Sequence, residues 1–188
     1  MVEKLFIAGD FHIPTRAKRF PEPFKKILSK EKWNYIVITG DLVQKEVLER
    51  FEPHLASNGK LIACQGNMDR FELPLFPTFT INSIKFGAYH GMNISPRDDV
   101  EQLKEVAAKM DVRVLFVGHS HKQLIYEDEE HIILNPGTAT GASGGSSWFI
   151  DQGIMTISVD VEYKTLTVKS YLLNSHQKLQ SITNQFEL

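Results

Sequence analysis

Short apolar runs recur along the chain, and most of them end in a glycine that is followed by a polar side chain. The runs are too short for helices and are rich in β-branched and aromatic residues, which predicts strands buried on both faces of a sheet. Four runs fit this description best: residues 5–8, 35–39, 61–64 and 112–117. The front half of the chain is therefore expected to form a parallel sheet with helical connections.

Three stretches between these runs have helical patterns. They are residues 21–30, 44–57 and 98–110. The first is opened by prolines and ends in lysines. The second is expected to kink or split at Pro53 and to stop at Asn58 and Gly59. The third has Asp98 and Asp99 at its start, where negative charge stabilises a helix, and an apolar face further along.

The rear half alternates between apolar and polar positions, which predicts antiparallel hairpins. Residues 79–81 and 84–89 form one predicted hairpin, and residues 154–161 and 165–172 form another. A further short strand is expected at residues 132–134. Two sheets packed face to face, with helices outside, fit this order of elements best, so the fold class is α/β.

Composition narrows the class of protein without identifying it. No repeat or linker divides the 188 residues, so a single domain spanning residues 1–188 is expected. A net charge of -2 argues against bulk binding to nucleic acid. The single cysteine, Cys64, lies in an apolar run and is expected to be a buried thiol in a reducing compartment. With no signal-peptide pattern and no run of membrane-spanning length, the predicted location is the cytoplasm, without membrane insertion.

Metal-capable side chains follow the predicted strands at the point where each strand ends. They are Asp10, His12, Asp41, Asn67, Asp69, His90, His119 and His121. In α/β sheets, ligands gather beyond the carboxyl ends of the strands, so these side chains are expected to converge. Carboxylate, imidazole and amide groups together suit divalent ions such as Mn, Fe or Zn. One such motif alone is weak, but five at successive strand ends predict a metal site.

Five segments together resemble the motif blocks of the calcineurin-like metallophosphoesterases. They are residues 9–12, 40–41, 66–69, 90–91 and 118–121, and the resemblance spans about residues 5 to 142. The small size and residues 135–142 resemble the compact phosphodiesterase subfamily that includes the retromer subunit with a phosphoesterase fold. Residues 10–14 and 24–28 are similar to that retromer branch. The resemblance implies a four-layer α/β/β/α sandwich of two mixed sheets flanked by helices.

The resemblance also implies a division of ligands between two divalent ions, Mn, Ni, Zn or Fe. One ion would be held by Asp10, His12 and His121, the other by Asn67, His90 and His119, and Asp41 would bridge them. Two ions about 4 Å apart would polarise a phosphate ester and activate a hydroxide that attacks phosphorus. The catalytic residues on this interpretation are Asp41, Asn67, Asp69 and His90, with Asp69 orienting its neighbours rather than binding metal.

Two departures from the family pattern leave the function open. Met68 stands where many members carry a histidine that protonates the leaving group, so slow catalysis is expected. Met92 follows His90-Gly91 where relatives often have a second histidine. The main hypothesis is a phosphoesterase, most of all a phosphodiesterase, acting on a small phosphate ester. The alternative is a scaffold or adaptor like the retromer subunit, with a protein partner and a vestigial metal crevice. A homo-oligomer is compatible with either.

Other features are expected to be ordinary. The basic residues Arg16, Lys18 and Arg19 fit a solvated loop, and the glycine- and serine-rich stretch 141–147 fits a loop, with a place at the rim of the site as one option. Trp148 and Phe149 are expected either to pack back or to meet a partner. The histidines outside the motif blocks, His54, His131 and His176, fit surface or core positions.

Overall fold

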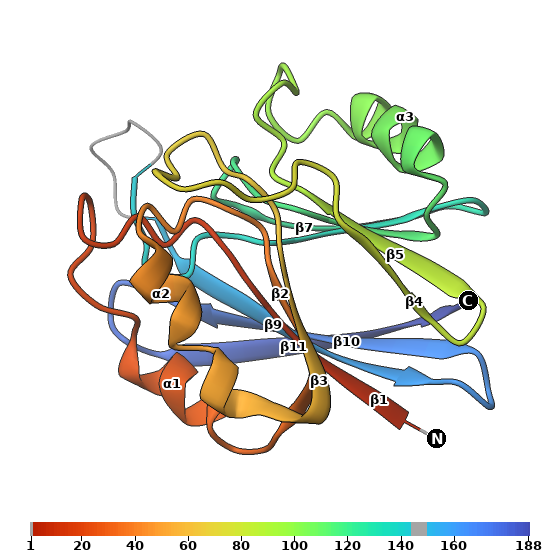
Figure 1. Ribbon diagram of the computed structural model, residues 1–188, viewed down its shortest axis with the longest axis horizontal. Coiled ribbons are helices and arrows are strands. Elements are labelled where there is room, and N and C mark those ends of the chain that lie inside the picture. The colour runs from red at the N-terminus through yellow and green to blue at the C-terminus, as the bar shows by residue number, and fades with distance from the viewer. Residues whose placement is uncertain (1, 144–149) are drawn as a thin grey trace.

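Two β-sheets pack face to face, and helices cover their outer faces (Figure 1). The computed structural model describes residues 2–143 and 150–188. The strands are β1 (Val2–Ala8), β2 (Trp33–Ile38), β3 (Leu55–Ala63), β4 (Thr78–Ile81), β5 (Ile84–Tyr89), β6 (Val114–Val117), β7 (Gln123–Glu127), β8 (Ile132–Pro136), β9 (Gln152–Asp160), β10 (Thr165–Leu173) and β11 (Leu179–Glu187). Within the described residues, one sheet has the order β11-β10-β9-β1-β2-β3 and the other β4-β5-β6-β8-β7.

Both sheets are mixed, as expected from the sequence. In the first sheet, β1 pairs parallel with β2, with Leu5 opposite Tyr35, and antiparallel with β9. In the second sheet, β6 pairs parallel with both β5 and β8, while the edge strands β4 and β7 are antiparallel to their neighbours. The parallel strands β1, β2 and β3 therefore present their carboxyl ends along one edge, and so do β5 and β6.

Alternation along the central strand β1 sorts its side chains between two hydrophobic layers. Leu5 and Ile7 face the core between the sheets. Phe6 and Ala8 face the outer layer, where helices α1 (Glu22–Leu28) and α2 (Lys45–Glu49) pack. The helix α3 (Val100–Met110) covers the outer face of the second sheet through Leu103. The predicted four-layer α/β/β/α sandwich is confirmed.

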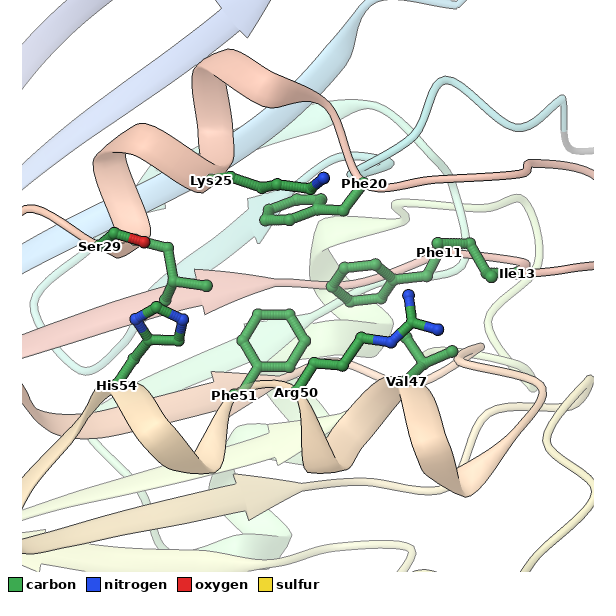
Figure 2. A pocket seen from close by; sticks show the side chains of 10 residues that line it. Phe11, Ile13, Phe20, Lys25, Ser29, Val47, Arg50, Phe51 and His54 are labelled. Carbon is green, nitrogen blue, oxygen red and sulfur yellow. The ribbon is translucent and has the colours of Figure 1, made fainter.

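The layer of α1 and α2 does not fill all the space above the first sheet. Three buried phenylalanines, Phe11, Phe20 and Phe51, pack against one another there and line a small pocket between the helices (Figure 2). Among the described residues, none of the helices has the length and apolar character needed to cross a membrane.

The helix predicted over residues 44–57 is wrong in its second half. Helix α2 ends at Glu49, a 3-10 turn η1 covers Glu52–His54, and β3 starts at Leu55. Pro53 lacks the backbone N–H that a continuing helix requires, which suits it to the first positions of the turn. Gly59 lies inside β3 rather than stopping a helix. Glycine suits this position because a Cβ there would press on the carbonyl of Trp33.

The sequence pattern did not predict two strands, β7 and β11. Strand β11 extends the first sheet by pairing with β10, from Thr165 opposite Glu187 to Leu173 opposite Leu179. Its first five residues are exposed on both faces, so no hydrophobic alternation marks it. Strand β7 pairs with β8 and is half-buried along most of its length, again without alternation. Both are edge strands, where the hydrophobic signal is weakest.

Candidate metal centre

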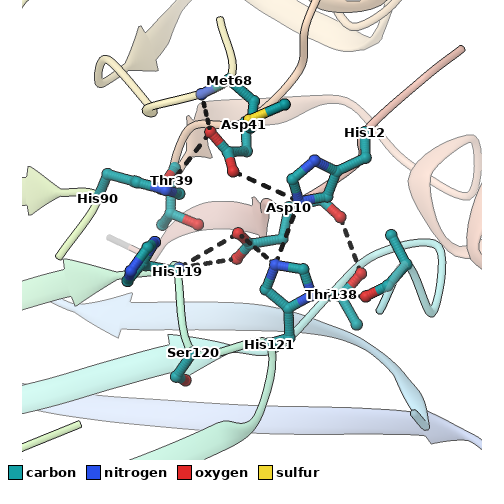
Figure 3. Close-up of polar contacts among 12 residues, drawn as sticks. Asp10, His12, Thr39, Asp41, Met68, His90, His119, Ser120, His121 and Thr138 are labelled. Atoms are coloured by element: carbon teal, nitrogen blue, oxygen red, sulfur yellow. Dashed lines mark hydrogen bonds and ion pairs between the residues drawn. The ribbon is translucent and has the colours of Figure 1, made fainter. Parts of the chain in front are cut away.

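The predicted metal-capable side chains meet at one place, beyond the carboxyl ends of five strands. Asp10 and His12 follow β1, Asp41 follows β2, and Asn67 follows β3. His90 follows β5, and the loop after β6 carries two further histidines. Figure 3 shows the side chains from these loops pointing toward one another. The crevice is therefore assembled from loops of both sheets.

Four buried side chains form the tightest cluster, and each offers one ligand atom within 4.8 Å of the others: Asp10, His12, Asp41 and His121. The Nε2 atoms of His12 and His121 are 3.1 Å apart. His12 Nε2 lies 3.4 Å from Asp41 Oδ2, and His121 Nε2 lies 3.3 Å from Asp10 Oδ1. Two carboxylates and two imidazoles thus surround a space sized for a single cation.

In two histidine rings, Nδ1 points to a backbone carbonyl, and this contact determines which ring nitrogen carries the proton. Nδ1 of His121 is 2.5 Å from the carbonyl of Ala142, and Nδ1 of His90 is 2.7 Å from that of Thr39. Since these ring nitrogens must donate, Nε2 of each neutral ring presents a lone pair to the crevice. A lone pair of His121 facing His12 Nε2 at 3.1 Å needs a proton or a cation beside it. The residues therefore fit a divalent metal ion.

A second group of ligand atoms lies on the other side of Asp41. Asp41 Oδ1 is 3.5 Å from His90 Nε2, which is 3.1 Å from Asn67 Oδ1. The ring of His119 stands edge-on to that of His90, with the centroids 5.1 Å apart. Because Oδ2 of Asp41 faces His12 and Oδ1 faces His90, the carboxylate has the position expected of a bridge between two ions. The bridging role remains a prediction.

The charges of the crevice are coupled. Burial opposes ionisation of Asp41, but its hydrogen bond and attraction to His90 outweigh burial and lower the Asp41 pKa to about 2. Burial also opposes the charged form of His90, yet Asp41 and Asp10 raise the His90 pKa to about 9. For His12, burial wins over both carboxylates and lowers the pKa to about 4. Burial opposes the charged form of His121 as well, yet its hydrogen bond and attraction to Asp10 raise the His121 pKa. Protonation is therefore favoured at His90 and His121 and disfavoured at His12.

Asp69 lies behind the cluster and holds its loops together. Its Oδ1 accepts the backbone N–H of Val43 at 2.8 Å, and its Oδ2 accepts those of Gly66 at 2.8 Å and Asp41 at 3.1 Å. The backbone N–H of Met68 donates to Asp41 Oδ1 at 2.8 Å (Figure 3). This geometry fits the orienting role predicted for Asp69, and it places no oxygen of Asp69 in the four-residue cluster.

Three residues that position the crevice were not singled out one by one from the sequence. The Thr138 hydroxyl donates to the carbonyl of Asp10, and the Thr140 hydroxyl donates to that of Phe11, both at 2.8 Å. Asn135 Nδ2 donates to the carbonyl of Gly118 at 3.1 Å. Their only signal was the resemblance of residues 135–142 to a subfamily, because threonine and asparagine near a strand end carry no periodic pattern.

Other predicted features take the following places. Arg16 is exposed, and its Nη1 donates to the carbonyl of Ser143 at 3.0 Å, so the loop after His12 touches the start of stretch 141–147. Residues 144–149, including Trp148 and Phe149, lie outside the described part of the chain. Cys64 is fully buried, as expected, and burial raises its pKa well above the ordinary value.

A two-sheet sandwich with aspartates and histidines gathered beyond its strand ends is the arrangement expected of a metallophosphoesterase, and comparison with known families gives the same class. Residues 4–159 match the calcineurin-like phosphoesterase superfamily domain. The chain belongs to this superfamily, and the resemblance seen in the five motif blocks is confirmed.

Within the superfamily, the chain is similar to vacuolar protein sorting proteins. It is 33% identical over 170 residues to Vacuolar protein sorting-associated protein 29 of Schizosaccharomyces pombe, a match that covers 89% of each chain. The structure of Vacuolar Protein Sorting 29 from Cryptosporidium parvum has a TM-score of 0.91 and 25% identity, covering 100% of this chain and 99% of that one. The zinc complex of Vps29 from Entamoeba histolytica has a TM-score of 0.86 and 26% identity, with coverage of 98% and 99%. These similarities confirm the predicted relation to the branch of retromer's phosphoesterase-fold subunit.

Proposed function

We propose that this chain acts as a protein-binding scaffold subunit in vacuolar protein sorting, of the kind that retromer's phosphoesterase-fold subunit exemplifies. The observation that carries the proposal is the 33% identity to a vacuolar sorting protein along 89% of both chains. The motif blocks alone favour an enzyme, but a match over 170 residues extends well beyond those blocks. The expected partner is a protein, and the expected location is the cytoplasm.

The side chain of Met68 supports the scaffold over a fast hydrolase. Its backbone N–H is tied to Asp41 Oδ1, so this residue lies beside the crevice (Figure 3). A thioether has no proton to give, so a leaving group would receive none from this position. Hydrolysis at this crevice would depend on leaving groups that depart as stable anions.

The crevice keeps a role in the scaffold because it fits divalent ions. Asp10, His12 and His121 would hold one ion and Asn67, His90 and His119 another, with Asp41 between them. Bound ions would compensate the buried carboxylates and present positive charge at the surface of the crevice. Asp69 and the threonines that fasten the loops would keep these ligands in place for an ion or for an acidic group of the partner.

Metal-dependent hydrolysis of a phosphate ester, most of all a phosphodiester, is the second candidate. It is favoured by one observation: the two oxygens of Asp41 face two separate groups of ligand atoms, 3.4 Å from His12 Nε2 and 3.5 Å from His90 Nε2. A chain that only binds a protein has no chemical need for this arrangement. The ion identity, Mn, Ni, Zn or Fe, belongs to this proposal as well.

Complementation separates the two functions. In fission yeast that lacks its own Vacuolar protein sorting-associated protein 29, the wild-type chain and the Asp41→Asn variant are expressed at matched levels, and missorting of a vacuolar hydrolase to the medium is measured. The scaffold proposal expects the wild-type chain to reduce missorting, and the Asp41→Asn variant shows whether the ion-binding crevice takes part. If only the wild type reduces missorting, the crevice is required, and the hydrolysis assay below distinguishes partner binding from catalysis. If neither chain does so at full expression, the scaffold proposal is overturned.

Direct assay decides the second candidate. Metal-stripped protein is resupplied with Mn, Ni, Zn or Mg and given bis(p-nitrophenyl) phosphate and p-nitrophenyl phosphate. Slow, metal-dependent turnover that is lost in His119→Ala would establish hydrolysis. The effect of Met68→His is measured on phenyl phosphate, whose phenolate departs poorly without a proton and should gain from the new donor, whereas turnover of p-nitrophenyl phosphate should change little. No gain in a folded variant would mean that the missing donor does not limit the reaction.

A further inference from the structure

A small cavity lies between α1 and the α2–η1 segment, on the outer side of the first sheet. None of the predicted metal ligands lines it, although Phe11 lies between two of them in the chain. Its volume is about 150 Å³. Six buried apolar side chains wall it: Phe11, Ile13, Phe20, Leu28, Val47 and Phe51. Protein interiors leave few voids larger than a water molecule. An engineered apolar cavity of about 150 Å³ binds benzene, so this space holds one ring-sized group.

The floor of the cavity is a cluster of aromatic rings that is already in place. The ring centroids of Phe11 and Phe20 are 5.6 Å apart, those of Phe11 and Phe51 are 5.5 Å apart, and those of Phe20 and Phe51 are 6.0 Å apart. Pairs at these distances and tilted angles are the favourable arrangement of aromatic side chains. A guest ring can therefore extend the cluster without rearranging it.

The mouth of the cavity is polar and positively charged. Lys25 on α1 and Arg50 at the end of α2 line it from facing helices, with Ser29 and His54 beyond them (Figure 2). Lys25 pairs with Glu22 at 3.3 Å; the Lys25 side chain is about half exposed and that of Glu22 largely exposed. Across the part of the chain that the structure describes, Arg50 has no ion pair. None of the described residues lining the cavity is acidic.

From this combination we propose that the cavity binds a small aromatic acid, a single ring that bears a carboxylate or a phosphate. The ring packs among Phe11, Phe20 and Phe51, and the anion pairs with Lys25 and Arg50. The volume excludes long acyl chains from the enclosed part of the cavity. The guanidinium of Arg50 offers paired donors that match the oxygens of either anion. This site requires neither a metal ion nor the scaffold function.

Binding of matched probes tests the proposal on the full chain in the presence of a chelator. The probes are phenylacetate, phenyl phosphate and uncharged benzyl alcohol, followed by NMR titration of the backbone amides. Saturable shifts are expected around Phe11, Phe20 and Phe51 with the two anions, and the tighter anion identifies the natural class. In the Lys25→Gln/Arg50→Gln variant, the affinity for the anions should fall by about fivefold or more, as expected for charge-assisted hydrogen bonds, while benzyl alcohol is unaffected.

A control variant that removes two positive charges outside the cavity separates the effect of the site from that of net charge. Lys26 and Lys45 lie on the same two helices but do not line the cavity. Lys26→Gln/Lys45→Gln should leave the affinity for all three probes unchanged. Val47→Phe should fill the cavity and remove binding of every probe, and if that variant does not fold, the charge variants still decide. Equal loss in the control, shifts confined to the metal crevice, or no saturable binding would overturn the proposal.

Discussion

Five of the seven predicted metal ligands have left-handed backbone conformations. The φ angles are 50° for Asp10, 49° for His12, 56° for Asp41, 69° for His119 and 65° for His121. For residues with a side chain this conformation costs roughly 1–2 kcal/mol each. Backbone hydrogen bonds between the loops maintain it, from Asp10 N to the Gly40 carbonyl and from His12 N to that of Asp41. Strain of this kind is typical of functional sites, because it aims side chains that an extended strand would send to opposite faces.

Asp41→Asn should weaken metal binding without unfolding the chain. The amide keeps the shape of the carboxylate and can still accept the N–H of Met68, but it removes a negative charge that faces both ligand groups. We expect zinc affinity, measured by competition with a chelating dye, to fall about tenfold or more, the scale of losses seen when groups supporting a metal site are removed. A folded variant with wild-type affinity would contradict the bridging position of Asp41.

Zinc binding should release protons at neutral pH. The pKa of His90 is raised to about 9, so its ring carries a proton at pH 7 that a metal ion must displace, and the pKa of His121 is raised as well. His12 and Asp41, with pKa values of about 4 and about 2, have already lost theirs. Apparent zinc affinity should therefore increase between pH 7 and pH 9. Calorimetry in buffers of different ionisation enthalpy measures the proton count, and a count of zero at pH 7 would contradict the assignment of charge to His90.

Residue types in the crevice could be predicted from the sequence, but their geometry could not. Aspartate and histidine after short apolar runs marked the ligands, since strand ends converge in α/β sheets. Aspartate adopts the left-handed backbone more often than most residues, but its presence at positions 10 and 41 does not by itself predict that conformation there. The contributions of Asn135, Thr138 and Thr140 depend on loops that are distant in sequence, so only a folded chain displays them.

At the scale of elements, burial decided what could be predicted. The run 5–8 within β1 and the whole of β6 were clear because every position there is buried and apolar or small. The segment after Pro53 was taken for helix because its residues favour neither state, and pairing with β2 decides the matter. Strand β11 is held by its ladder to β10, with exposed side chains that leave no hydrophobic pattern.

Helix α3 offers an element-scale test of local stability. Asp99 is its N-cap, and the side chain accepts the N–H of Gln102 at 2.9 Å. Asp99→Ala removes this hydrogen bond and should lower the free energy of unfolding by about 1 kcal/mol. Urea denaturation measures the difference, with Glu101→Ala, on the exposed first turn, as the control. Equal effects of the two substitutions would indicate that charge near the helix end, rather than the cap, provides the stability.

For the molecule as a whole, the crevice joins the two sheets, so an ion bound there should stabilise the complete fold. Its ligands come from loops after strands of both sheets, and they lose their arrangement when the chain unfolds. At zinc concentrations 100 times the dissociation constant, the stabilisation is about 2.7 kcal/mol. For a chain of this length, we expect Tm to rise by about 5–10 °C.

Thermal denaturation with zinc and with a chelator checks this expectation. The double variant His12→Ala/His121→Ala lacks two ligands of the tight cluster and serves as the control. Its Tm should rise less with zinc than that of the wild type, because only the second group of ligand atoms remains. A similar zinc response in the control and the wild type would place the stabilising ion elsewhere in the molecule.

The pairing of β1 with β9 also determines when the crevice can be completed during synthesis. Strand β1 enters the sheet between β2 and β9, and the carbonyls after β1 are held by Ala139, Thr138 and Thr140. When only the first half of the chain has been synthesised, all residues of the first motif are present, but the residues that hydrogen-bond to them are not. The earliest-made ligands must wait for more than 120 residues to leave the ribosome. During synthesis, the part of the molecule that carries its chemistry can therefore be completed only after most of the chain has been made.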